Sequence, residues 1–144
     1  MATIFIQRTI KAPVQDVFDA YVDHGSWIEV PGVLSAKVVQ PGRVEHNGIG
    51  AIREIAAPGA WFREEITAFD RPHRMEYKVL KSVPPLRHDL GLVEFRQTAD
   101  GTLVSWTSHF HSKIPFTDGL VKQVGTQIFG LVLRTIDKRL TAKV

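Results

Sequence analysis

The sequence of 144 residues contains no cysteine. A disulfide framework, a thiolate nucleophile and a cysteine-ligated zinc site are therefore excluded. No stretch approaches the ~18 consecutive apolar residues of a membrane-spanning helix. The N-terminal segment from Met1 to Arg8 has no apolar run long enough for a signal peptide. These absences predict a protein without a transmembrane segment and favour the cytoplasm as its location.

A strong excess of charge is also missing, because 18 Lys and Arg residues stand against 15 Asp and Glu residues, a formal net charge of +3. The basic residues are scattered along the chain, and no nucleic-acid-reading motif accompanies them. Nucleic-acid-binding proteins usually combine a clustered basic surface with such a motif. The sequence therefore predicts that nucleic acid is not a partner.

Motifs for several kinds of chemistry are absent as well. The segment Gly48-Ile49-Gly50 lacks the Lys-Ser/Thr ending of a phosphate-binding loop, and no nucleophilic-serine motif occurs. His109 and His111 alternate onto one face of a predicted strand, but no third ligand accompanies them. We predict that both histidines lie on the outer face of the sheet, and we expect neither a metal nor a cofactor.

The length suits one domain over residues 1–144, since a chain of this size buries roughly two-thirds of its unfolded surface. Alternating β-branched and aromatic residues predict a first strand from Thr3 to Ile10, and Pro13 then opens a helix. A short second helix follows near Trp27. Six further strands are predicted, at Leu34–Val39, Gly48–Ile55, Trp61–Phe69, Met75–Lys81, His88–Gln97 and Leu103–Ile114.

Short turns separate these strands, for example at Asp100-Gly101, which predicts an antiparallel meander. After Pro115 a helix is expected from Thr117 or Asp118 to about Lys143. Together these elements predict an α+β protein in which a curved sheet of about seven strands wraps around the C-terminal helix and leaves a cavity between them. The apolar stripe of that helix comprises Leu120, Val124, Ile128, Leu131, Val132, Ile136 and Leu140.

Several short segments carry a family resemblance through their order and spacing. They are Ile10–Phe18, Asp23 with Trp27 before Pro31-Gly32-Val33, Gly48–Arg53, Arg63–Asp70 with Pro72, Gly101–Trp106, and the C-terminal helix. In this pattern the whole chain resembles the polyketide cyclase/dehydrase-like branch of the START-related, birch-pollen-allergen-like superfamily (SRPBCC). The resemblance implies a helix-grip fold with an internal cavity. Its members include cyclases, lipid carriers, hormone receptors and co-chaperones, so it implies a ligand more firmly than a reaction.

Alternate side chains of a strand share a face, which predicts the residues that point toward the helix. In the last strand Val104, Trp106, Ser108 and Phe110 share the inner face. Applied to the other strands and the helix, the same pattern predicts the residues that contact a bound molecule. They are Phe62, Ile66, Met75, Val79, Phe95, Trp106, Val124, Ile128 and Val132.

Glu64 falls on the same predicted face as Phe62 and Ile66, which places a carboxylate among apolar side chains. One interpretation makes Glu64 a general acid or base, with Arg53 or Tyr77 stabilising an enolate oxygen. The other makes Arg53 and Glu64 a cross-strand ion pair of structural importance only. A one-residue change of register would turn both side chains over. His88, near a strand start, is predicted to be a surface histidine, with the cavity rim as the alternative.

Three functions remain open at this point. The leading hypothesis is binding of a hydrophobic or lipid-like small molecule, with or without chemistry on it. The first alternative is a polyketide cyclase/dehydratase-type enzyme that uses Glu64, Arg53 and Tyr77. The second is a co-chaperone-like or membrane-docking module. That module requires one basic patch, for which the candidates are Lys113, Lys122, Lys138 and Lys143. Under each of the three hypotheses the protein is expected to be a monomer or a homodimer.

Overall fold

The computed structural model describes residues 2–142, which form one sheet, two α-helices and a 3₁₀ helix. The chain begins with β1 (Ala2–Ile10), α1 (Val14–Val22) and the 3₁₀ helix η1 (His24–Glu29). The remaining elements are β2 (Ser35–Gln40), β3 (Ile52–Ala57), β4 (Ala60–Asp70), β5 (Arg74–Val83), β6 (Leu86–Thr98), β7 (Gly101–Ser112) and α2 (Asp118–Thr141).

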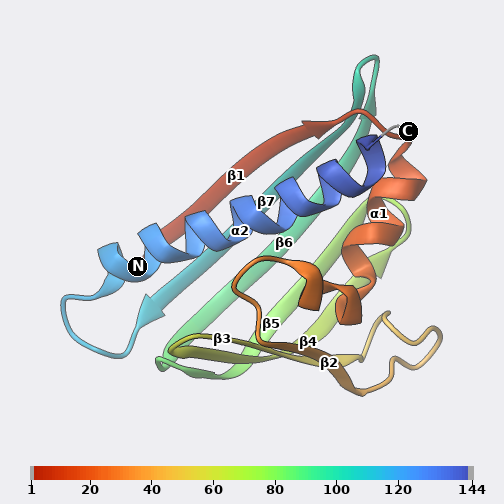
Figure 1. Ribbon diagram of the computed structural model, residues 1–144. Coiled ribbons are helices and arrows are strands. Elements are labelled where there is room, and N and C mark those ends of the chain that lie inside the picture. The colour runs from red at the N-terminus through yellow and green to blue at the C-terminus, as the bar shows by residue number, and fades with distance from the viewer. Residues whose placement is uncertain (1, 143–144) are drawn as a thin grey trace.

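The seven strands form one antiparallel sheet in the order β1-β7-β6-β5-β4-β3-β2. Strand β1 pairs with β7, so the first and the last strands of the chain are neighbours in the sheet. Figure 1 shows α2 running along the inner side of the curved sheet, close to β1 and β7, with α1 near the C-terminal end of α2. The predicted helix-grip fold is confirmed.

Several predicted boundaries differ from the structure. Strand β3 begins at Ile52 rather than Gly48, because the backbone from Gly48 to Ala51 closes a turn instead, with Ala51 N–H donating to the Gly48 carbonyl at 3.0 Å. Strand β7 ends at Ser112 rather than at Ile114. The end predicted for α2 at Lys143 lies outside the described residues.

One end of the space between sheet and helices is filled by aromatic side chains, and we call this region the aromatic core. Tyr21 contacts Trp27 and Trp106 edge to face, with ring centroids 5.3 and 5.1 Å apart. Phe18 packs on Phe95 in the same manner at 5.0 Å. Edge-to-face pairs of this kind stabilise a core beyond the area that they bury. The residues that α2 buries against this region are Val132, Leu133 and Ile136.

The first half of α2 is packed differently. Gly125 lets the helix come close to β1, since a Cβ there would lie 2.6 Å from Ile4 Cδ1. Leu120 and Val124, which the predicted stripe turned toward the sheet, are 63% and 47% exposed. The helix faces the sheet along the line from Val121 through Gly125, and residues one position earlier point about 100° away from it. The stripe prediction is wrong for these two residues.

The basic residues that the interaction-module hypothesis requires in one patch are spread along the molecule. Lys113 precedes α2 and Lys138 lies in its last turn. Since a helix rises about 1.5 Å per residue, Lys122 and Lys138 are separated by roughly 24 Å along α2. The candidate Lys143 lies outside the described residues. None of the helices within residues 2–142 combines the length and the apolar character needed to cross a membrane.

Candidate ligand-binding cavity

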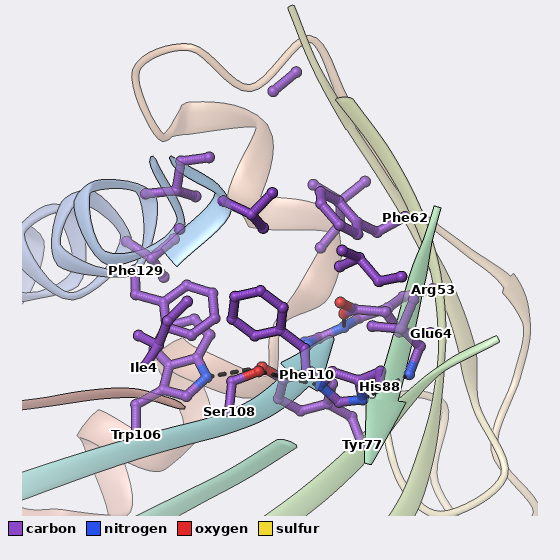
Figure 2. A pocket seen from close by; sticks show the side chains of 18 of the residues that line it. Ile4, Arg53, Phe62, Glu64, Tyr77, His88, Trp106, Ser108, Phe110 and Phe129 are labelled. Atoms are coloured by element: carbon purple, nitrogen blue, oxygen red, sulfur yellow. Dashed lines mark hydrogen bonds and ion pairs between the residues drawn. The ribbon is translucent and has the colours of Figure 1, made fainter. Parts of the chain in front are cut away.

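A cavity of about 110 Å³ lies between the first half of α2 and the inner face of the sheet. Figure 2 shows it between Phe129 and Ile4 on one side and Phe62, Arg53 and Glu64 on the other. Five side chains in its wall carry polar groups: Arg53, Glu64, Tyr77, His88 and Ser108. The other lining residues are Ile4, Trp27, Val33, Ile55, Ala57, Phe62, Val79, Leu86, Trp106, Phe110, Val121, Gly125, Ile128, Phe129 and Val132.

The structure divides the predicted ligand-contacting residues into two groups. Ile66, Met75 and Phe95 are buried in the aromatic core and are not among the lining residues, and Val124 is half exposed outside the cavity. Strand alternation predicts the face of a side chain but not its position along the strand, and the same inner face serves the core and the cavity. The predicted residues that do line the cavity are Phe62, Val79, Trp106, Ile128 and Val132.

Arg53 and Glu64 are direct cross-strand partners on β3 and β4. Arg53 Nε donates to Glu64 Oε1 at 2.7 Å, and the two residues are only 1% and 8% exposed. Both also line the cavity. The register, which the sequence left open, turns both side chains inward, and the pair is at once a structural ion pair and part of the cavity wall.

Arg53 has a second polar partner and two aromatic neighbours. Its Nη1 lies 3.1 Å from His24 Nδ1, and its guanidinium carbon lies 4.6 Å from the ring centroid of Trp27 and 4.9 Å from that of Tyr77. Burial, followed by the charge of Arg53, holds the pKa of His24 well below its usual value. His24 is therefore neutral at pH 7, and the Nδ1 atom accepts the arginine proton while Nε2–H donates to the Asn47 carbonyl.

The opposing charge of Glu64 keeps Arg53 cationic. Although burial opposes the charge, Glu64 raises the pKa of Arg53 above its usual value. Because a buried charge is tolerated only when it is paired, each member of this ion pair depends on the other. The pair brings no net charge into the cavity wall.

Tyr77 reaches across the sheet because its neighbour has no side chain. Gly91 on β6 lies opposite Tyr77 on β5 and opposite Ser108 on β7. A Cβ at Gly91 would lie 2.4 Å from Tyr77 Cζ, so the phenol ring occupies that space. Its hydroxyl thereby meets Trp106, whose Nε1–H donates to Tyr77 Oη at 2.9 Å. Burial, together with the Glu64 charge, raises the pKa of Tyr77, which keeps the phenol protonated.

His88 is buried in the cavity wall rather than exposed, which corrects the surface prediction. It is 6% exposed, and its ring stacks on Tyr77 with centroids 5.4 Å apart. Val79 N–H donates to His88 Nδ1 at 3.2 Å, and His88 Nε2 lies 3.2 Å from Ser108 Oγ. Burial lowers the pKa of His88, so the neutral form prevails at pH 7.

A β-bulge explains why alternation missed His88. The pairing of β6 with β7 shifts between His88 and Leu90, so one extra residue, Asp89, interrupts the alternation. Strict alternation back from Val93 turns Asp89 inward and His88 outward. The signal in the sequence is Asp89 itself, since a carboxylate without a partner is expensive to bury.

The histidines predicted on the outer face make other contacts. Thr3 Oγ1 lies 2.9 Å from His109 Nδ1, and His111 Nδ1 lies 2.9 Å from Asp118 Oδ2. Neither belongs to the cavity lining. Across residues 2–142, no cluster of three or more His, Cys, Asp or Glu residues is arranged to hold a metal ion.

Comparison with known proteins shows the family of this chain. A family model described as "Polyketide cyclase / dehydrase and lipid transport" matches residues 1–142. This chain belongs to that family. The family lies within the START-related SRPBCC superfamily, as the sequence resemblance implied. A comparison with curated proteins finds no match.

Solved structures of low sequence identity share the fold. The Zhui aromatase/cyclase from Streptomyces sp. R1128 is 14% identical with a TM-score of 0.76, over 98% of this chain and 96% of that one. A START superfamily protein from Mycobacterium smegmatis is 9% identical with a TM-score of 0.76, over 97% of both chains. The protein TTHA0849 from Thermus thermophilus is 21% identical with a TM-score of 0.76, over 98% of both chains. At such identities the likeness concerns the fold alone.

Proposed function

We propose that this family member binds a largely apolar small molecule in the cavity and orients it with the polar side chains in the wall. One observation carries the proposal: fifteen of the twenty lining residues are apolar or glycine, and the five with polar groups converge on one side. Ligand sites are usually built in this way, with apolar walls for affinity and a few polar groups for orientation. The lipid transport in the family description supports the same function.

The size of the cavity limits what it encloses. An engineered cavity of about 150 Å³ with apolar walls holds benzene, so about 110 Å³ suits a group of similar scale. The stacked rings of Trp106 and Phe129, 4.0 Å apart and nearly parallel, form one side of this space. A planar or short-chain apolar group therefore fits the wall best.

A pair of variants on one helix tests whether binding occurs in the cavity. Val121 lines it and Val124, three residues later, is half exposed outside it. With toluene, whose ring is of the size that suits the cavity, we expect saturable binding by the natural protein in ligand-observed NMR. Val121→Trp should weaken binding at least ~10-fold by filling the space, whereas Val124→Trp should leave it unchanged. Absence of saturable binding, or equal effects of the two variants, would contradict the proposal.

A second candidate function is cyclase or dehydratase chemistry, favoured by the carboxylate in the wall. Glu64 lines the cavity together with Tyr77, and the Oε1 atom of Glu64 accepts a hydrogen bond from Arg53 Nε. In this mechanism Glu64 transfers the proton, and Tyr77 donates a hydrogen bond to the enolate oxygen that forms. The family description names such reactions.

Turnover of a short poly-β-ketone, followed by mass spectrometry, separates the two candidates. The enzyme hypothesis expects cyclised or dehydrated product from the natural protein and a loss of at least ~100-fold in Glu64→Gln, with probe binding retained. Ser105→Ala, on the outer face of β7, is the control and should keep full turnover. If the natural protein binds the compound and releases it unchanged, the enzyme hypothesis is wrong and the binding function stands.

A further inference from the structure

The hydrogen bonds around His88 have only one possible direction. A backbone N–H can only donate, so His88 Nδ1, 3.2 Å from Val79 N, must be an acceptor and carries no proton. The neutral ring then has its proton on Nε2. His88 Nε2–H therefore donates to Ser108 Oγ, 3.2 Å away.

Tyr77 receives a hydrogen bond for the same reason. The indole N–H of Trp106 can only donate, so Tyr77 Oη accepts it at 2.9 Å. The hydroxyl oxygens of Tyr77 and Ser108 are thus both acceptors, and each hydroxyl still has one proton to donate.

At most one of these hydroxyls can donate to the other. If Ser108 donates to Tyr77, the proton of Tyr77 is left over, and the reverse case leaves the proton of Ser108. Both residues line the cavity, next to apolar side chains. One O–H donor is therefore available to a bound molecule in either arrangement, and its direction is set by His88 and Trp106.

We propose that Tyr77 and Ser108 form a donor site for one neutral acceptor oxygen of the bound molecule, a carbonyl oxygen above all. In this site His88 is a positioning residue. The inference rests on the proposed binding function and adds the chemical class of the ligand. A ligand with a carboxylate in place of the carbonyl fits less well. Arg53 is already bonded to Glu64 and His24 and brings no unpaired positive charge.

Two small probes of matched shape test the proposal. Acetophenone and ethylbenzene differ only in a carbonyl oxygen in place of two hydrogens, and their dissociation constants are measured by ligand-observed NMR. Loss of one neutral hydrogen bond should weaken acetophenone about 3- to 10-fold relative to ethylbenzene in the double variant Tyr77→Phe/Ser108→Ala, because in either single variant the remaining hydroxyl can still donate. The control is Ser105→Ala on the opposite face of β7, where both affinities should be unchanged.

The role of His88 needs a readout that general destabilisation does not change. The ¹³C shift of a labelled acetophenone carbonyl reports its hydrogen bond. We expect a downfield shift on binding to the natural protein, a smaller one with His88→Leu, and recovery with His88→Gln, whose amide again offers an acceptor and a donor.

The outcomes separate the two proposals. If the double variant Tyr77→Phe/Ser108→Ala weakens both probes equally and the carbonyl shift is absent, the donor site is wrong although the cavity binds ligands. If acetophenone, ethylbenzene and toluene all fail to bind to the natural protein, the binding function itself is wrong, and so is the donor site.

Discussion

The two ends of the space under α2 are built on the same inner face of the same sheet, yet one is filled and the other hollow. In the aromatic core, α1 supplies Phe18 and Tyr21, and the space closes completely around them. Around the cavity, α1 contributes none of the lining residues, and the small side chain of Ser108 stands in the wall. The two ends therefore differ in the side chains that reach into the space, since both lie on the same sheet.

Arg53 lies at the boundary between the two ends. Its guanidinium contacts the rings of Trp27 and Tyr77, and both of these residues belong to the buried core and also line the cavity. An ion pair one position along the same hairpin, Arg63 with Glu54, has an exposed arginine and a partly buried carboxylate, and it joins neither region. The hairpin therefore contains a buried ion pair and a more exposed one.

Replacing Arg53 should have the largest effect on the free energy of unfolding. Arg53→Met leaves Glu64 buried without its partner, and we expect a loss of about 3–5 kcal/mol in the free energy of unfolding, measured with urea. The exposed analogue Arg63→Met should lose no more than ~1 kcal/mol. Adding Glu64→Gln to Arg53→Met should recover most of the loss. Equal losses in the two arginine variants would remove the distinction between the pairs.

Two isoleucines on α2 compare the filled and hollow ends directly. Ile136 is 3% exposed in the aromatic core, and Ile128, two turns earlier, lines the cavity. We expect Ile136→Ala to cost about 2–4 kcal/mol, because it leaves a void among packed groups. Ile128→Ala should cost only about 1 kcal/mol, since one side of that residue already lacks neighbours. Urea unfolding measures both, and a similar cost at the two positions would contradict the division into two ends.

Adding one methyl group at Gly91 tests what keeps the cavity wall in place. Because its Cβ would collide with Tyr77, Gly91→Ala should displace the phenol and break the hydrogen bond from Trp106. Overpacking of this kind costs roughly 1–3 kcal/mol. The near-ultraviolet circular dichroism of the aromatic rings should change, and the preference for acetophenone should disappear. Gly59→Ala is unsuitable as a control since its φ is +75°, whereas Gly119→Ala meets open space and should be neutral.

Low pH should lower the free energy of unfolding, by less than the substitutions above. His24 and His88 remain neutral in the folded protein because their pKa values are lowered, whereas in the unfolded chain they take up a proton below about pH 6.5. Their contribution is therefore complete above pH 6.5 and declines as the pH falls below it. By pH 5.5 we expect a loss of about 1 kcal/mol per histidine. Urea unfolding at both pH values should show a weaker pH dependence in His24→Asn than in His46→Asn, which replaces an exposed histidine. An unchanged dependence in His24→Asn would contradict the assignment.

Much of this structure could be predicted from the sequence. Turn residues and alternation predicted seven strands in their order along the chain, and the cross-strand ion pair of Arg53 with Glu64, one of the two interpretations, is present in the structure. These features depend on local backbone preferences and on a period of two, both of which are visible in a single chain.

Features that depend on three-dimensional fit could not be predicted. The sequence did not separate Ile66 and Phe95, in the aromatic core, from Phe62 in the cavity wall, because all three lie on one face. The exposure of Val124 follows from how α2 is rotated against the sheet, which an apolar stripe defines only broadly. His88 was missed because a bulge is a property of paired strands and leaves little trace in one of them.

The bulge at Asp89 also has a consequence for how the strand tolerates change in length. Deleting one residue from a strand ordinarily turns every following side chain to the opposite face. In β6 the extra residue Asp89 is exposed between two segments that already differ in phase, with His88 inward on one side and Gly91 and Val93 inward on the other. Removing it leaves regular alternation through His88, Gly91 and Val93. The strand therefore consists of two segments whose alternation differs by one residue, and Asp89 lies between them. A chain of this family that lacks this residue can keep the same cavity wall.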